Sequence, residues 1–145
     1  MPKRRDRHAR GLRGPLSRPN AFTGEAVPVR RRPSNAEFFL ICLDAAVERI
    51  QEAAPAALSR IDVGAEDVPV PDASWAAHRV PLAAALEATP ERHGQIVLFR
   101  RPLELRSHTR RELRLLVFRT VVEQLSAISG YTVEMLDPKG ITREE

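Results

Sequence analysis

Residues 109–130 decide the fold, and they read TRRELRLLVFRTVVEQLSAISG. Apolar side chains recur there every three or four residues, which is the period of an amphipathic helix. Thr109 and Glu112 have the spacing of a capping box at the start of a helix, and Gly130 is a residue type that ends one. The stretch therefore predicts a long helix with one face in the core. The residues of that face are Leu113, Leu116, Val117, Val121, Leu125 and Ile128.

Upstream of this helix the sequence predicts a second helix and a short sheet. Ser34 and Glu37 form another capping box, and the apolar period continues over Phe38–Ala53. The apolar run Gln95–Arg100, which Pro102 follows, is the clearest strand. We expect an irregular strand over Arg60–Val70, with a slip at Glu66 and Asp67.

The remaining segment with a pattern, Val80–Leu86, fits a short strand or a turn of helix. The order of these elements predicts an α+β fold in which a short sheet packs on two long helices. We expect this domain to cover residues 35–138 and residues 139–145 to form a flexible C-terminus.

The first segment of the chain differs in composition from the rest. Residues 1–35 contain ten Arg or Lys and two acidic residues, a net charge of +8, whereas residues 36–145 carry −4. The segment has no sustained apolar period, so we expect residues 1–34 to be a disordered basic tail. Such a tail could bind nucleic acid weakly and without sequence preference through residues 1–33.

Composition excludes several classes of protein. The chain has 145 residues, of which 43% are hydrophobic and 29% charged, as expected of one globular domain. Charges interrupt every apolar stretch, and the basic start lacks an apolar signal segment, so we expect neither a membrane span nor secretion. Cys42 is the single cysteine, which excludes a disulfide framework. We therefore expect a cytoplasmic, bacterial protein.

The histidines do not form a recognisable metal motif. His78 and His93 fall in predicted loops, His108 precedes the long helix, and His8 lies in the tail. No two are spaced to ligate one metal from a single helix. Convergence of the loop histidines on a metal stays open at this point.

The stretch from Phe118 to Tyr131 resembles the active-site helix of minimal single-domain bacterial zincin-like metallopeptidases. In that family, Arg-Thr-Val-Val is followed by His-Glu-x-x-His and then by glycine three positions later. The segments Val97–Glu104, Val63–Pro69 and Phe39–Asp44 also resemble family segments, in the same order. The resemblance implies a zincin-like domain with a zinc site on this helix.

The residues at the motif positions depart from the family. Glu123 replaces the first histidine, Gln124 replaces the glutamate that serves as general base, and Ala127 replaces the second histidine. An alanine supplies no ligand atom, and the amide of a glutamine cannot accept a proton from water at neutral pH. The sequence thus predicts no metal ligands, no catalytic residues and no bound cofactor, although zinc is expected of the family.

We therefore expect a catalytically inactive family member that works as a binding or regulatory module for an unidentified protein or peptide. Arg119, Glu123, Gln124 and Ala127 mark the degenerate motif and a possible ligand cleft, and Arg119 and Glu123 have the spacing of a helical ion pair. One alternative is an active metal-dependent peptidase with ligands from Glu123 and the loop histidines. Another is a nucleic-acid-associated protein that acts through its basic arm.

Overall fold

The structure is a computed structural model, and it describes residues 22, 24, 32–69 and 80–143. The chain divides into two units, Met1–Pro33 and the compact unit Ser34–Glu145. Most of residues 1–34, which we expect to be disordered, lie outside the described residues. His78 also lies outside them. The described helices and strands all belong to the compact unit Ser34–Glu145.

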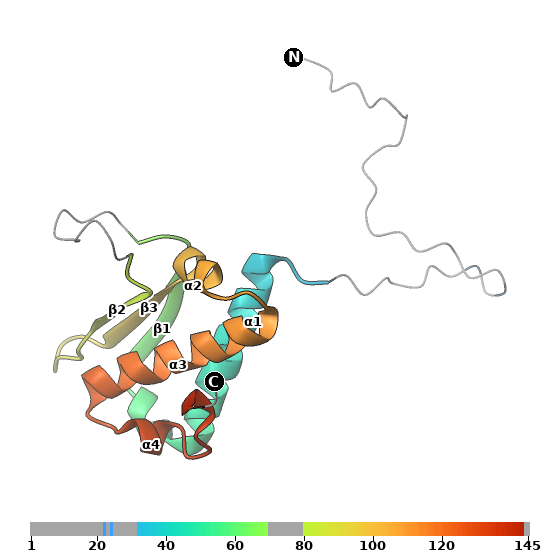
Figure 1. Cartoon of the computed structure of the whole chain (residues 1–145). Coiled ribbons are helices and arrows are strands. Elements are labelled where there is room, and N and C mark those ends of the chain that lie inside the picture. The colour runs from blue at the N-terminus through green and yellow to red at the C-terminus, as the bar shows by residue number, and fades with distance from the viewer. Residues whose placement is uncertain (1–21, 23, 25–31, 70–79, 144–145) are drawn as a thin grey trace, which may run out of the picture. The chain divides into compact units, whose positions relative to one another are not determined.

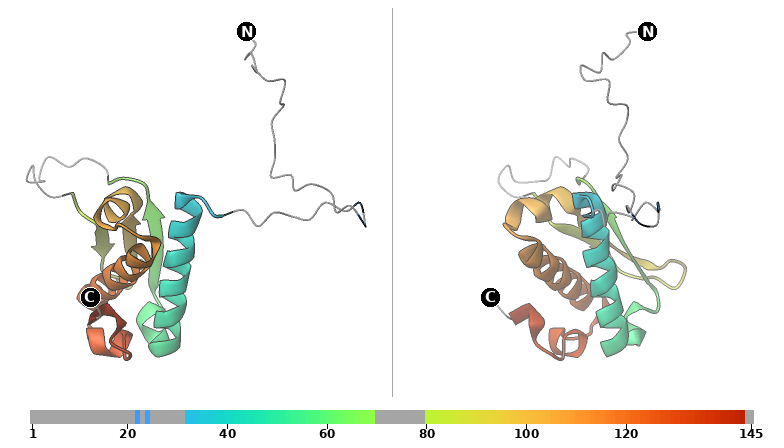
Figure 2. Two further views of the ribbon diagram at one scale, coloured as in Figure 1. Left: turned by 45° about the vertical axis from the view of Figure 1, so that its right-hand side comes forward. Right: turned by 90° about the vertical axis from the view of Figure 1, so that its right-hand side faces the viewer.

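This unit has the expected α+β architecture, with helices and a mixed three-stranded sheet (Figure 1). The strand order is β1-β3-β2, with β3 parallel to β1 and antiparallel to β2. Figure 2 shows the helices gathered on one face of the sheet. The elements are α1 (Asn35–Ala53), η1 (Pro55–Leu58), β1 (Ile61–Glu66), β2 (Ala83–Leu86), β3 (Gly94–Phe99), α2 (Arg100–Arg106), α3 (Arg110–Ser129), α4 (Val133–Leu136) and η2 (Ile141–Arg143).

The sheet alternates between a buried and an exposed side, as expected when one face is covered. In β3, Ile96 and Leu98 are buried against the helices whereas Gln95 is exposed. Gly94 starts β3 because the backbone of the preceding hairpin passes close by. A Cβ atom at this position would lie 3.0 Å from the amide nitrogen of Ala88 and from the carbonyl oxygen of Leu86.

Both predicted long helices are confirmed, together with most of their caps. The Ser34 hydroxyl accepts from the Glu37 amide, and the Glu37 carboxylate accepts from the Ser34 amide. Thr109 caps α3, and Gly130 ends it at φ +76°, a left-handed conformation that suits glycine. The box at Thr109 is only half formed, because the Glu112 carboxylate accepts instead from the backbone N–H of His108.

The strands differ from the expectation at their ends. β1 stops at Glu66, so the slip expected at Glu66 and Asp67 is the end of the strand. The segment that fitted a strand or a helical turn contains the strand β2. The helix α2 was not predicted, because Pro102 has the residue type that commonly follows the end of a strand. Pro102 instead lies in the first turn of this helix, where a missing N–H breaks no helical hydrogen bond.

Residues 139–145, which we expect to be a flexible C-terminus, contain η2 in their described part, residues 139–143. Its middle residue, Thr142, is buried. The Asp137 carboxylate accepts hydrogen bonds from the backbone N–H of Thr142 at 2.7 Å and from its hydroxyl at 2.9 Å. These bonds join η2 to the end of α4, and the hydrogen bond from the Arg119 side chain to the Thr142 carbonyl joins it to α3. Sequence periodicity does not reveal these restraints.

None of the described helices is long and apolar enough to cross a membrane.

Candidate functional site

The second half of α3 carries the predicted site residues, and the two sides of this helix have different environments. Val121, Val122 and Leu125 are fully buried in the core. Glu123 and Ala127 are exposed, one helical turn apart on the solvent side of the helix. The helical period thus separates the residues that hold the fold from the positions where the family motif has imidazoles.

Arg119 and Gln124 complete the four predicted site positions. The Arg119 Nε donates to the backbone carbonyl of Thr142 at 3.0 Å, so this side chain holds η2. Within the described residues, the ion pairs do not include one between Arg119 and Glu123. Gln124 is half-buried beside Glu123. The four residues therefore share a helix without forming one polar cluster.

The described histidines have other surroundings. His93 lies just before β3, and its Nδ1 is 3.5 Å from the Asp62 Oδ1 in an ion pair in which both side chains are exposed. His108 precedes α3, about 20 Å along the helix axis from Glu123 at 1.5 Å per residue. Convergence of the loop histidines stays untested, since His78 lies outside the described residues.

A zinc site needs three or four nitrogen, sulfur or oxygen ligands around one point. Across residues 32–69 and 80–143, no group of three or more His, Cys, Asp or Glu side chains is arranged to hold a metal ion. Of the two positions one helical turn apart on α3, Glu123 offers a single exposed carboxylate and Ala127 offers only a methyl group. The described residues at this position do not fit zinc.

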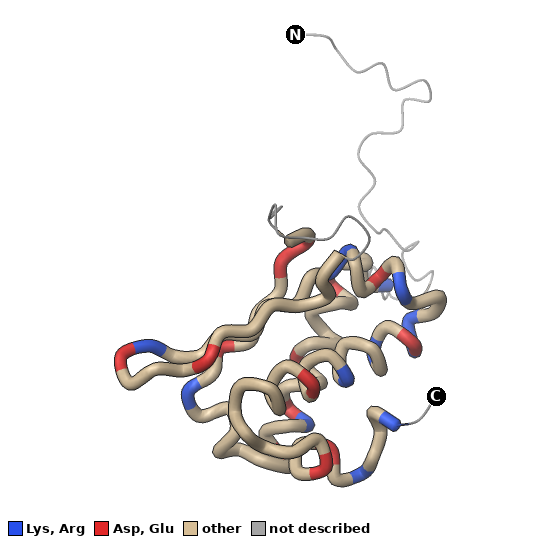
Figure 3. The backbone as a smooth tube through the Cα atoms, turned by 60° about the vertical axis from the view of Figure 1, so that its left-hand side comes forward, with Lys and Arg blue, Asp and Glu red and all other residues tan. Residues whose placement is uncertain are grey.

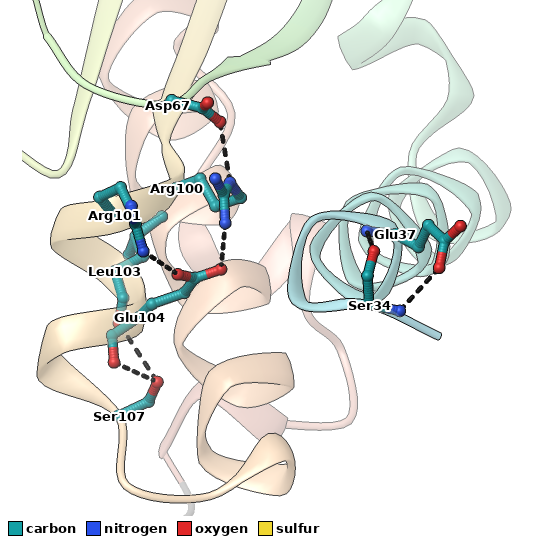
Figure 4. A network of polar contacts seen from close by, with 8 residues as sticks. All are labelled: Ser34, Glu37, Asp67, Arg100, Arg101, Leu103, Glu104 and Ser107. Atoms are coloured by element: carbon teal, nitrogen blue, oxygen red, sulfur yellow. Dashed lines mark hydrogen bonds and ion pairs between the residues drawn. The ribbon is translucent and has the colours of Figure 1, made fainter. Parts of the chain in front are cut away.

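A polar network lies where the parallel strands β1 and β3 end (Figure 4). The largely buried Arg100 guanidinium donates from Nε to Asp67 at 2.8 Å and from a terminal nitrogen to Glu104 at 2.9 Å. The hydrogen bond and charge of Arg100 lower the pKa of the Asp67 carboxyl. The backbone N–H of Arg101 also donates to the Asp67 carbonyl. This network joins β1 to α2 and gives the Val97–Glu104 segment a structural role.

A groove of about 530 Å³ lies between α1 and the first half of α3. The sequence did not predict this groove. Three exposed arginines line it, Arg49 from α1 and Arg111 and Arg114 from α3, and we call it the arginine groove. Its floor includes the buried side chains of Cys42 and Phe118. Figure 3 shows basic and acidic residues intermixed along the backbone. The arginines of the groove come from two helices that pack on each other.

Cys42 is a floor residue without the features of a reactive thiol. Its side chain is 1% exposed, as expected from its place beside the apolar face of α1. Burial raises the pKa of the Cys42 thiol, and the hydrogen bond from Arg114 offsets this effect only in part. A raised pKa lowers the fraction of nucleophilic thiolate, so the residue serves packing.

Comparison with a family model agrees with the α+β fold described above. A family model described as zincin-like metallopeptidase matches residues 58–141, which is more than half of the chain. The matched range runs from the end of η1 to the start of η2, and it contains the whole sheet and α3. No curated protein matches the chain significantly.

Proposed function

The chain belongs to the family of zincin-like metallopeptidases, and on this premise we propose that it is a catalytically inactive member that works as a binding or regulatory module. One observation carries the proposal. On the solvent side of α3, an exposed carboxylate and an exposed methyl group, Glu123 and Ala127, occupy positions one turn apart where the family motif has two imidazoles.

The chemistry of the neighbouring position supports the same conclusion. In the family motif, a glutamate beside the first histidine takes a proton from the metal-bound water. Gln124 replaces it here, and an amide cannot act as a general base at neutral pH. Both parts of the reaction, metal binding and water activation, thus lack their side chains on this helix.

The experiment measures zinc in the full-length protein after dialysis against metal-free buffer, together with cleavage of a fluorogenic peptide library. We expect less than stoichiometric zinc and no cleavage. One equivalent of zinc that a chelator removes, or cleavage that Glu123→Gln abolishes, would show that the protein is an active peptidase with other ligands.

A gain-of-binding variant tests whether the positions have been identified correctly. We expect Glu123→His/Gln124→Glu/Ala127→His to bind zinc at least about tenfold more tightly than the natural chain, because two imidazoles at i and i+4 can chelate one ion. The single variant Glu123→His is the matched control, since Ala127 then leaves one imidazole alone. Equal zinc affinity of the triple variant and the control would contradict the assignment of these positions to a former zinc site.

A second candidate function rests on the uneven charge of the chain. Residues 1–35 carry +8 and the remainder carries −4. This segregation favours weak, salt-sensitive contact of the N-terminal segment with nucleic acid. In that case the folded unit would be positioned by its basic arm.

A further inference from the structure

The arginine groove continues into a smaller neighbouring cavity. That cavity, of about 190 Å³, lies beside the last turn of α1 and shares Arg49 and Ile141 with the groove. Together the two follow α1 from Cys42 to Ala53. At 1.5 Å per residue this is about 16 Å, which is the length of about three helical turns.

Two of the three arginines of the groove lie over aromatic rings. The Arg49 guanidinium carbon lies 5.4 Å from the centre of the Phe118 ring, and that of Arg114 lies 5.9 Å from the Phe38 ring. A guanidinium that stacks on a ring keeps its N–H edge available to a carboxylate. The ring contacts therefore order these cations in advance of binding, which lowers the entropic cost of engaging a partner.

The three arginines of the groove form no close ion pair with a carboxylate of the described residues, although the charge of Arg49 acts on the Asp137 carboxylate of the smaller cavity. One carboxylate, that of Glu112, lines the same groove, and one of its oxygens accepts from the His108 N–H. The arginine groove therefore has an excess of positive charge, although residues 36–145 as a whole are negative. The smaller cavity does not add to this excess, because Glu52 and Asp137 line it beside Arg49 and Lys139.

We propose that the arginine groove docks a short acidic amphipathic helix of a partner protein. Leucine-like side chains of that helix would cover the floor around Phe118, and its Asp or Glu residues would pair with Arg49, Arg111 and Arg114. The length of the track matches about three turns of such a helix, and helices commonly bind in grooves of this kind.

The composition of the groove separates this occupant from others. The apolar floor offers nothing to a phosphate backbone, so an amphipathic peptide fits better than a nucleic acid. The chain's own residues 1–35, with a net charge of +8, would be repelled. The proposal goes beyond the loss of peptidase chemistry and does not depend on it, because the groove does not include Glu123, Gln124 or Ala127.

The test measures fluorescence anisotropy with a synthetic labelled peptide that spans three helical turns, with leucines on one face and glutamates beside them. We expect saturable binding to the full-length chain. Arg49→Glu/Arg111→Glu should weaken it at least about tenfold, because it places like charges against the peptide. Arg111→Glu alone, at an exposed residue away from the aromatic rings, is a second variant in case the double change impairs folding.

The matched control is Arg92→Glu, which makes the same charge change at an exposed residue of the β2–β3 hairpin, outside the groove. The N-terminal segment is present in every variant, so its general attraction for acidic peptides is common to all. Binding should be the same for Arg92→Glu and the natural chain. A peptide with lysines in place of the glutamates should not bind.

Several results would overturn the proposal. These are absence of saturable binding, equal loss of binding in Arg92→Glu and in the groove variants, or equal binding of the lysine peptide. Binding of an oligonucleotide in place of the peptide would identify a nucleic-acid site. Self-association that the groove variants abolish would identify a second copy as the occupant, since Asp44, Glu48 and Asp62 line another groove on α1. Zinc content and peptide cleavage report separately on the proposed function.

Discussion

The two sides of the second half of α3 differ in what they retain of the family. The buried side has Val121, Val122 and Leu125, each without exposed surface, in the helical period that the fold requires. The solvent side has Glu123 and Ala127, which cannot form the helical zinc site of the motif. Packing determines the residue types on the buried side, whereas the loss of the family's reaction residues on the solvent side is part of the proposed function.

The largest expected effect is on the buried side. Leu125→Ala should lower the free energy of unfolding by about 2–5 kcal/mol, because it leaves a cavity under the sheet. Urea unfolding followed by circular dichroism measures the change. Glu123→Ala is the control from the solvent side of the same helix, and it should stay within about 0.5 kcal/mol of the natural chain. Similar losses for both variants would contradict the division of α3 into two sides.

A smaller loss of stability is expected where Asp137 at the end of α4 binds η2. Asp137→Ala should cost about 2 kcal/mol, because it leaves the N–H and hydroxyl of the buried Thr142 without their acceptor. Asp137→Asn, which removes the charge and keeps one acceptor oxygen, should cost less in the same unfolding measurement. A stability unchanged by Asp137→Ala would show that η2 does not contribute to the folded unit.

The same carboxylate predicts a dependence on pH. Burial alone would raise the pKa of Asp137, but the hydrogen bonds from Thr142, with a smaller contribution from the charge of Arg49, lower it below its usual value. The unfolded chain therefore binds a proton at a higher pH than the folded chain. This stabilisation should be complete above about pH 5 and be lost as the pH falls below about 4. Asp137→Asn should remove this part of the pH profile of stability, and an unchanged profile would contradict the assignment.

The smallest effect on the folded unit should come from removing residues 1–33. Ser34–Glu145 form their own compact unit, so the urea midpoint should not change. Binding to a random-sequence oligonucleotide should be weak in the full-length chain, decrease steeply with salt and disappear after the deletion. Binding that persists in residues 34–145 would assign nucleic-acid contact to the folded unit.

The sequence predicted the parts of the fold that local chemistry determines. The caps at Ser34 and Gly130 and the apolar period of α3 fixed both long helices. The helix α2 was not predicted because a proline is common both after a strand and in the first turn of a helix, and the sequence around Pro102 does not distinguish the two. The place of η2 depends on Thr142 meeting Asp137 and Arg119, and the second of these contacts is distant in sequence.

The candidate sites were predictable to different degrees. The degenerate motif at Glu123, Gln124 and Ala127 stays a prediction, and it could be proposed from the sequence because its spacing lies within one helix. The arginine groove could not, because Arg49 and Arg114 come from different helices and meet only after α1 packs on α3. The sequence does show three basic residues close together at the start of α3, at positions 110, 111 and 114. Their spacing alone does not predict that Arg49 of α1 lies in the same groove.

The order of strands in the sheet also has a consequence for how the chain folds. β3 comes last of the three strands in sequence and lies in the middle, so β1 and β2 both take their ladder partner from residues 94–99. Neither outer strand can form its backbone hydrogen bonds before β3 is in place, and α3 begins a few residues after β3 in the sequence. We therefore expect sheet formation and helix docking to occur in one cooperative step, whose rate is set by loop closure from β1 to β3.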